Sequence, residues 1–150
     1  MQVLLQRVLE ASVTVEQSVV GQIGRGLLVF ICAEHGDTNE TSLKMLEKIL
    51  KLRIFSDHAG KMNLSVQDVS GALLIVSQFT LAADTTKGSR PSFGGAAAPQ
   101  QAKLLYEGFV NLARQSGLSV QTGEFAADMK VALVNDGPVT IPLRIQTGNI

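Results

Sequence analysis

Alternating apolar and polar residues open the chain. This period of two runs through residues 3–8 and 12–20 and predicts strands, because successive side chains of a strand point to opposite faces. A glycine-rich turn at residues 21–26 follows, and it leads into the apolar run 27–33, which is typical of a buried strand. The first part of the chain is therefore predicted to be β-structure.

Apolar residues at helical spacing predict two helices. Thr38 or Asn39 can cap the first helix, and Pro99 suits the first turn of the second, which ends near Gly117. The apolar stripe of the first helix consists of Leu43, Leu46, Ile49 and Leu50. The stripe of the second consists of Ala102, Leu105, Tyr106, Phe109, Leu112 and Ala113.

Further strands are predicted at residues 72–82, 129–134 and 139–145, the last two separated by a Gly-Pro step that interrupts a hairpin. Several strands precede the first helix and consecutive strands follow the second. This order predicts a mixed α/β (α+β) fold rather than strict βαβ alternation. We expect one domain over residues 1–150, because no linker, repeat or low-complexity segment divides the chain.

The composition favours a cytoplasmic protein. Apolar residues make up 45% of the chain and charged residues 17%, which argues against disorder. The longest apolar runs are too short to span a bilayer, so no membrane partner is expected, and the first residues lack the features of a secretory signal. The single cysteine, Cys32, lies in an apolar strand and is predicted to be a buried, inert thiol.

The charge pattern argues against a non-specific nucleic-acid binder. The 13 basic and 13 acidic residues cancel, whereas such binders neutralise many phosphates, so DNA is not expected as a partner. A pocket that holds one end of a nucleic acid remains compatible with this charge. His35 and His58 each lie in a polar turn and are expected to be exposed, and no Cys/His spacing suggests a metal or another cofactor.

The sequence Ser77-Gln78-Phe79-Thr80-Leu81 places polar side chains in the predicted strand 72–82. Strand alternation would put Gln78 and Thr80 on one face, where burying an unpaired polar group costs about 1–3 kcal/mol. These groups are therefore either paired within the fold or exposed to a pocket. No local spacing supplies a base for a Ser77 or Thr80 nucleophile, so a hydrolase would rely on positioning and on backbone N–H groups.

The second distinctive segment is Asn135-Asp136-Gly137-Pro138-Val139-Thr140. Its Gly-Pro step can be an ordinary turn. It can also be a cis bond, since the cis form costs only about 0.5–1 kcal/mol before proline. A cis bond there would present the Gly137 carbonyl outward, as an acceptor for a substrate ammonium group. Both alternatives are open from the residues alone.

The two segments resemble the signature motifs of the D-aminoacyl-tRNA deacylase family. The resemblance extends along the chain, through residues 6–8, 11–13, 26–29, 53–57, 60–63, 82–85, 90–93 and 122–129. It implies a homodimer of layered β/β/α architecture with its active site at the subunit interface. It also implies hydrolysis of the ester between a D-amino acid and the terminal ribose of tRNA, as chiral proofreading, with glycyl-tRNA as a further substrate.

The resemblance also implies roles for individual residues. Ser77, Gln78, Phe79 and Thr80 would line the catalytic pocket that receives the terminal adenosine at the tRNA 3′ end. Gly137 and Pro138 would form a cis gate that enters the partner subunit's pocket, holds the α-amino group and excludes an L side chain. The remaining residues of the implied site have supporting roles: Arg7, Leu81, Met129, Asn135 and Thr140.

Two mechanisms are compatible with this family. Thr80 could be a nucleophile, or the ribose 2′-hydroxyl could assist while N–H groups near Phe79 and Thr80 stabilise the oxyanion; the lack of a nearby base favours the second. A non-catalytic module that binds aminoacyl-tRNA and a generic Ser/Thr esterase are the alternative functions. The sequence departs from the family in two places: the loop at residues 94–98 consists only of glycine and alanine, and the tail at residues 141–150 is long. Pro142 in this tail predicts an edge position or a bulge.

Overall fold

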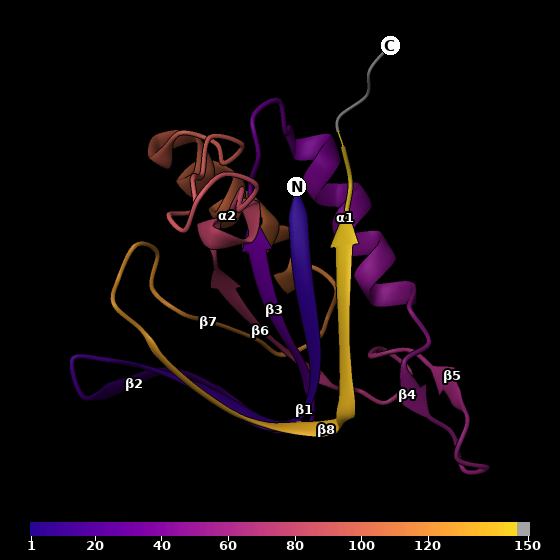
Figure 1. Ribbon diagram of the computed structural model, residues 1–150. Coiled ribbons are helices and arrows are strands. Elements are labelled where there is room, and N and C mark those ends of the chain that lie inside the picture. Colours follow the sequence, from indigo (N-terminus) through magenta and orange to yellow (C-terminus); the bar gives the residue numbers. More distant parts are fainter. Residues whose placement is uncertain (147–150) are drawn as a thin grey trace.

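A long, bent strand organises the sheet. β1 (Gln2–Val15) pairs antiparallel with β3 (Gly26–Cys32) along its first half and with β2 (Ser18–Ile23) along its second half. β8 (Lys130–Arg144) runs antiparallel to β1 along both halves, so the two strands bend together (Figure 1). The computed structural model describes residues 1–146, and the end of the predicted tail lies outside them.

The remaining elements follow β3. β6 (Ala72–Ser77) lies parallel to β3, and β7 (Val120–Thr122) lies parallel to β6, which gives the order β2-β1-β3-β6-β7 with β8 beside β1. β4 (Phe55–Ser56) and β5 (Met62–Leu64) form a separate small hairpin. The helices are α1 (Asn39–Lys51) and α2 (Pro99–Arg114), and both lie on the same side of the sheet (Figure 1).

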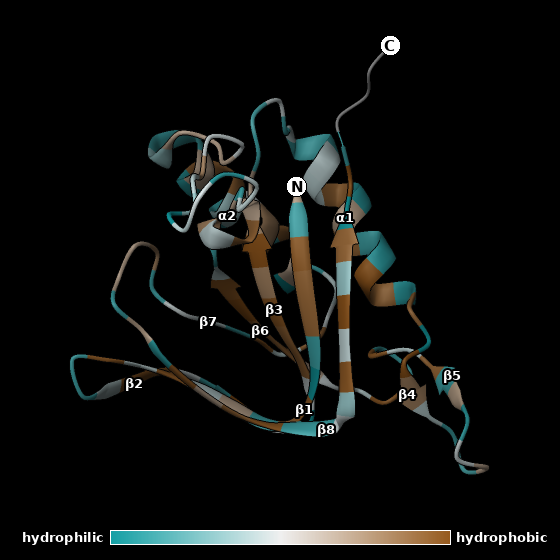
Figure 2. Ribbon diagram, viewed as in Figure 1, coloured by the Kyte–Doolittle hydropathy of each residue, from teal (hydrophilic) through white to brown (hydrophobic). Residues whose placement is uncertain are grey.

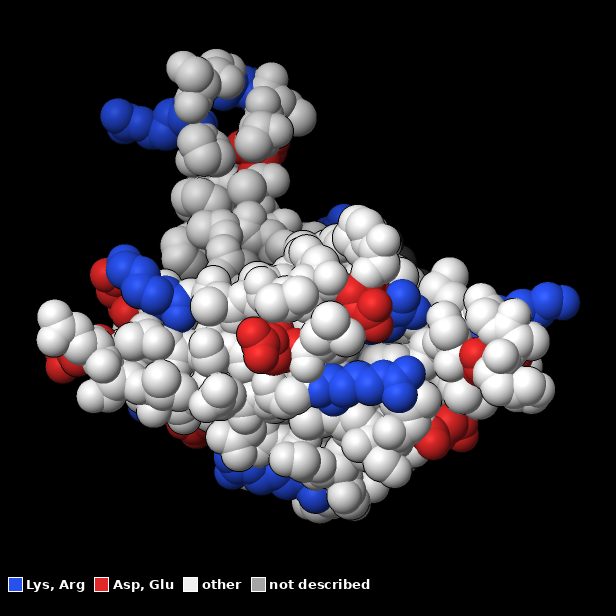
Figure 3. Space-filling model, turned by 90° about the horizontal axis from the view of Figure 1, so that it is seen from below, with Lys and Arg blue, Asp and Glu red and all other residues white. Residues whose placement is uncertain are grey.

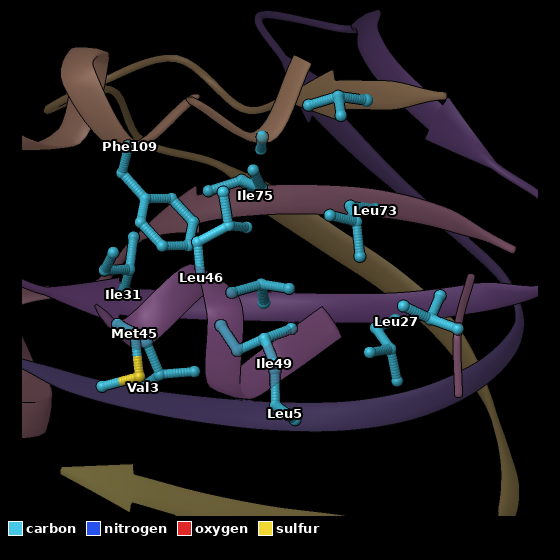
Figure 4. Close-up of a cluster of buried hydrophobic side chains, with 14 of the residues drawn as sticks. Val3, Leu5, Leu27, Ile31, Met45, Leu46, Ile49, Leu73, Ile75 and Phe109 are labelled. Carbon is cyan, nitrogen blue, oxygen red and sulfur yellow. The ribbon is translucent and has the colours of Figure 1, made fainter. Parts of the chain in front are cut away.

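Two apolar cores separate three layers. Alternate residues of β3 and β6, among them Leu27 and Ile75, face the helices and share one core with Phe109 of α2 (Figure 4). Leu28 and Leu74 point to the opposite face and pack against the bent β1, β2 and β8. Because both faces of β3 and β6 are covered, these strands are hydrophobic along most of their length (Figure 2). The predicted mixed, layered β/β/α fold is confirmed.

The helix ends follow from local sequence. Thr38 is the N-cap of α1 and forms a reciprocal capping box with Thr41, while Pro99 occupies the first turn of α2. Leu43 remains 43% exposed although it was predicted on the apolar face, and Met45 is fully buried in its place. The buried face of α1 is therefore rotated relative to the prediction.

The strand predicted over residues 72–82 was wrong beyond Ser77. The last sheet bond runs from the Gln78 N–H to the Ile31 carbonyl (2.8 Å), close to where β3 ends. Without a neighbouring strand to pair with, the chain turns into the 3₁₀ helix η1 (Phe79–Ala82). Strand alternation therefore does not determine where the side chains of Gln78 and Thr80 point.

The predicted closing hairpin was also wrong, because residues 130–144 form one strand. Asn135 lies opposite Val8, and Thr140 lies opposite Gln6. Four residues of β8, 136–139, therefore stand opposite the single residue Arg7 of β1 and form a bulge. The Gly137-Pro138 bond within this bulge is cis. Since both halves of β8 pair with the same continuous partner, the Gly-Pro step bends the strand instead of reversing it.

Pro142 has the edge position that the sequence predicted. It lies opposite Leu4 of β1, and β1 is the strand with which β8 pairs in the described part of the chain. The register does not shift at this point, so there is no bulge at the proline. No helix among residues 1–146 combines the length and the apolar character that a membrane crossing requires.

Candidate active site

A cavity of about 680 Å³ lies where β3 and β6 end. Apolar and small side chains from five segments dominate its lining, which suits the burial of a small organic group. These segments are Met1, the stretch from Ile31 to His35, Ser77–Phe79, the loop from Phe93 to Ala102 with Tyr106, and the stretch from Phe125 to Met129.

Two loops form a rigid rim on one side of the cavity. The His35 N–H donates to the Gly95 carbonyl (3.2 Å), and the Ala97 N–H donates to the Ala33 carbonyl (2.9 Å). Between these bonds Glu34 and Ala96 form an antiparallel β-bridge. The small residues of the loop at 94–98 thus pair with the chain beyond β3 and hold one wall in place.

The first motif forms another edge of the cavity. Ser77, Gln78 and Phe79 line it, and the 57% exposed Phe79 ring meets the Phe93 ring edge to face, with 5.1 Å between centroids. The Gln78 amide donates to the Thr80 hydroxyl, and neither Thr80 nor Leu81 is part of the lining. The sequence had left two alternatives for these polar groups, pairing within the fold and exposure to a pocket, and the motif shows both.

Backbone donors are present at the same edge. The N–H groups of Phe79 and Thr80 belong to the first turn of η1, and the first donors of a helix have no acceptor within it. Cys32 lies beneath this turn, with its sulfur 3.6 Å from the Phe79 carbonyl oxygen. Burial, followed by the nearby Glu34 carboxylate, raises the pKa of the Cys32 thiol, which keeps it protonated.

Aromatic residues and a methionine form a further part of the lining. Tyr106 and Phe125 pack with centroids 5.8 Å apart, and the Tyr106 hydroxyl donates to the Ile75 carbonyl (2.9 Å). Burial is the main cause that raises the pKa of Tyr106 to about 12, so it acts as a neutral donor. A Cβ on Gly123 would lie 2.6 Å from the Met129 sulfur, so this glycine leaves the space that Met129 occupies.

The second motif lies away from the cavity of its own chain. Arg7, Asn135, Gly137, Pro138 and Thr140 are all absent from the lining. Gly137 and Pro138 are exposed, and Gly137 has φ +133°, which L side chains rarely adopt. Within one chain the two motifs therefore lie apart, and the expectation that the second motif enters the partner subunit's pocket stays a prediction.

Arg7 holds the bulge that carries the cis bond. Its side chain is buried, its Nε donates to the Asp136 carbonyl (2.9 Å), and the same nitrogen lies 3.4 Å from the Asp136 carboxylate. Its Nη1 donates to the Ile54 carbonyl (2.7 Å). Because both ends of this guanidinium are bonded, Arg7 fixes residues 136–138 relative to the segment before β4.

Comparisons with known proteins identify the family. Residues 4–144 match the family model described as D-Tyr-tRNA(Tyr) deacylase. The chain belongs to this family. It is 65% identical to the D-aminoacyl-tRNA deacylase of Aromatoleum aromaticum over 95% of this chain and 93% of the relative. It is 60% identical to that of Ruegeria sp. over 94% and 90% of the two chains. Members of the family are hydrolases that cleave ester bonds, and the family predicted from the two motifs is confirmed.

Solved structures confirm the fold. A structure of the c-Myc DNA Unwinding Element Binding Protein matches with a TM-score of 0.92 and 40% identity, over 98% of this chain and all of that chain. A structure described as a probable eukaryotic D-amino acid tRNA deacylase matches with a TM-score of 0.84 and 19% identity, over 96% and 98% of the two chains.

An ionic network beside the rim was not predicted. The Met1 ammonium group bonds to the carboxylates of Glu34 (3.1 Å) and Asp37 (2.9 Å), and Arg144 donates to the other Glu34 oxygen (2.9 Å). These residues come from both ends of the chain and from the loop after β3. No local pattern could have revealed them, because only the pairing of β1 with β3 and β8 brings them together.

Proposed function

We propose that this chain is a chiral proofreading enzyme that hydrolyses the ester between a D-amino acid and the terminal ribose of tRNA. Its family supports the deacylase reaction. One observation carries the proposal for the site: an apolar cavity is edged by Ser77, Gln78 and Phe79, at the point where the first turn of η1 begins. Ser77, Gln78 and Phe79 would receive the terminal adenosine and the ester there. Single-stranded tRNA ends are found in the cytoplasm, which is where we place the protein.

The chemistry would depend on the backbone and the substrate. Water attacks the ester carbonyl carbon, and the N–H groups of Phe79 and Thr80 stabilise the developing oxyanion. The C–O bond to the ribose then breaks, the ribose oxygen takes a proton, and a free amino acid and tRNA are released. The 2′-hydroxyl next to the ester would relay the proton. The Thr80 hydroxyl is bonded to the Gln78 amide, which is no base, so we assign Thr80 a positioning role.

Chirality would be read by a second copy of the chain. The exposed Gly137 and Pro138 lie outside the cavity of their own subunit, which fits a gate that enters the partner's cavity. Their carbonyls would hold the α-amino group and leave no room for an L side chain. Glycine has no side chain to exclude, so glycyl-tRNA would also be a substrate. Asn135 and Thr140 flank the bulge on β8, and we assign them supporting roles there.

The surface near the gate suits a homodimer. Leu9 is 54% exposed and Val134 is 44% exposed, both close to the bulge opposite Arg7. Figure 3 views the bend of β1 and β8 from below and shows a largely uncharged surface with single positive and negative side chains interspersed. A surface with few charges and with exposed apolar side chains is typical of a contact between copies.

The loop after η1 supplies a test of tRNA binding. Lys87 and Arg90 are exposed on it, and the Asp84–Ser92 bridge closes its base. If both contact phosphates, the double alanine variant should flatten the dependence of log Kd on log salt by about 1.4–1.8 units. Filter binding to uncharged tRNA at several salt concentrations measures this. A variant with alanine at the exposed Lys48 and Lys51 of α1 is the control, and an unchanged slope would exclude the loop from the interface.

The reaction itself is tested by parallel time courses on D-tyrosyl-tRNA and L-tyrosyl-tRNA without added metal. We expect rapid loss of the D ester alone. Equal loss of both esters would indicate an unselective esterase. Loss of neither ester, with tRNA binding retained, would indicate a binding module.

A further inference from the structure

His35 is the one residue among those lining the cavity whose side chain can carry a positive charge, within the described chain. The sequence suggested only an exposed turn residue. The side chain is exposed, but it lies at the rim of the cavity, and His58 does not. An imidazole donates hydrogen bonds in both of its protonation states, and its charge changes near neutral pH.

The backbone fixes His35 at this place. Its own N–H is bonded to the Gly95 carbonyl, and the preceding residue forms the bridge to Ala96. Glu34 is anchored in turn, because Arg144 and Gln2 donate to its carboxylate. A side chain on such a support is placed without a large loss of backbone entropy when a ligand binds.

The charges around His35 are already balanced. Two carboxylates, Glu34 and Asp37, face two cations, the Met1 ammonium group and Arg144, within hydrogen-bonding distance. Burial alone would raise the pKa of Glu34, but bonds from Arg144 and the ammonium group outweigh this and lower it, so the carboxylate stays ionised. These carboxylates and cations are bonded to one another, and the His35 side chain is the group at the rim that can donate to a further anion.

We propose that His35 binds a backbone phosphate of the single-stranded tRNA 3′ end, the one that joins the terminal adenosine to the preceding nucleotide. This inference rests on the proposed function. With the terminal adenosine in the cavity, a strand that leaves across the rim brings this phosphate, the first anion along it, to His35. The imidazole would fix the direction in which the strand leaves and contribute to binding rather than to the chemical step.

The test compares His35→Gln with His35→Lys, and with His58→Gln as the control at an exposed histidine outside the cavity. Single-turnover deacylation of D-tyrosyl-tRNA is measured against enzyme concentration at several salt concentrations. For His35→Gln we expect an unchanged rate at saturation and a higher half-saturating concentration. At about pH 5.5, where an imidazole is mostly protonated, its salt slope should be smaller by about 0.7, the value for one phosphate on a single strand. His35→Lys should retain the slope.

A second substrate separates the phosphate contact from a change in cavity shape. Adenosine carrying a 3′-D-tyrosyl ester contains no phosphate, so every variant should hydrolyse it as the wild type does. A wild type that hydrolyses neither substrate would refute the proposed function. An active wild type with equal slopes for His35→Gln and His58→Gln would overturn the phosphate contact. Equal impairment of His35→Gln on both substrates would overturn it as well.

Discussion

A D-tyrosyl-tRNA whose terminal ribose lacks the 2′-hydroxyl should be hydrolysed about 10²–10⁴-fold more slowly than the normal substrate, the usual contribution of a positioned proton-transfer group. Thr80 is bonded to the Gln78 amide, and the nearby Cys32 thiol is protonated, so neither is activated as a nucleophile or a base. The proton must then move through the substrate. Single-turnover rates at saturating enzyme, with the amino acid on the 3′ oxygen of both substrates, measure the effect.

Thr80→Ala is the matching change on the protein. It removes the hydroxyl and leaves the backbone N–H groups of η1 in place, so substantial activity should remain. A loss of several orders of magnitude in single-turnover rate, with tRNA binding intact, would make Thr80 the nucleophile. Normal turnover of the 2′-deoxy substrate would likewise exclude assistance by the ribose.

Gly137→Val should lower the rate on D-tyrosyl-tRNA by about 100-fold or more, because a misplacement of 1 Å at a reacting centre can have that effect. Gly137 has φ +133°, and a Cβ there would lie 3.0 Å from a Val139 methyl group and 3.2 Å from the Arg7 guanidinium. A valine would crowd the bulge and the cavity that it enters. The rate on the D ester and the yield of folded protein are measured together.

Gly60→Val is the control for this substitution. Gly60 also has a positive φ, +78°, but a Cβ there would meet no atom within 4 Å, so the variant carries the backbone strain without the crowding. It should retain activity. Unchanged D-ester kinetics in Gly137→Val would show that the bulge lies outside the active site.

Mixed dimers test whether the gate acts across subunits. A chain with Gly137→Val is combined with one whose cavity is filled by Ala102→Trp, each inactive alone. If the gate enters the partner's cavity, the mixed dimer joins an intact cavity with an intact gate, and activity returns. No recovery in dimers shown to be mixed would place gate and cavity in the same subunit.

The strength of the gate can be expressed as a free energy. A thousandfold preference for the D ester over the L ester corresponds to about 4 kcal/mol between the two transition states.

Local signals predicted most of the fold but not the ends of two strands. Strand alternation at residues 3–8, the cap at Thr38 and the proline at residue 99 all depend on near neighbours, and each has its counterpart in the structure. The strand at 72–82 and the closing hairpin failed for one reason. Where a strand ends depends on the length of its neighbour. β6 ends at Ser77 because β3 ends beside it, whereas β8 continues past the bulge at residues 136–139 because β1 continues beside it.

The sequence by itself determined the family and the two motifs, because motif residues lie close together along the chain and can be recognised without knowing where they point. Only the tertiary structure decided which residues line the cavity of one chain, that Gln78 bonds to Thr80, and that His35 borders the cavity. The Gln78–Thr80 bond is local, but it forms in the turn that begins where the chain stops pairing with β3. The places of the motifs and of His35 depend on contacts between residues distant in sequence, such as the pairing of β1 with β3 and β8. Spacing along a chain carries no information about such contacts.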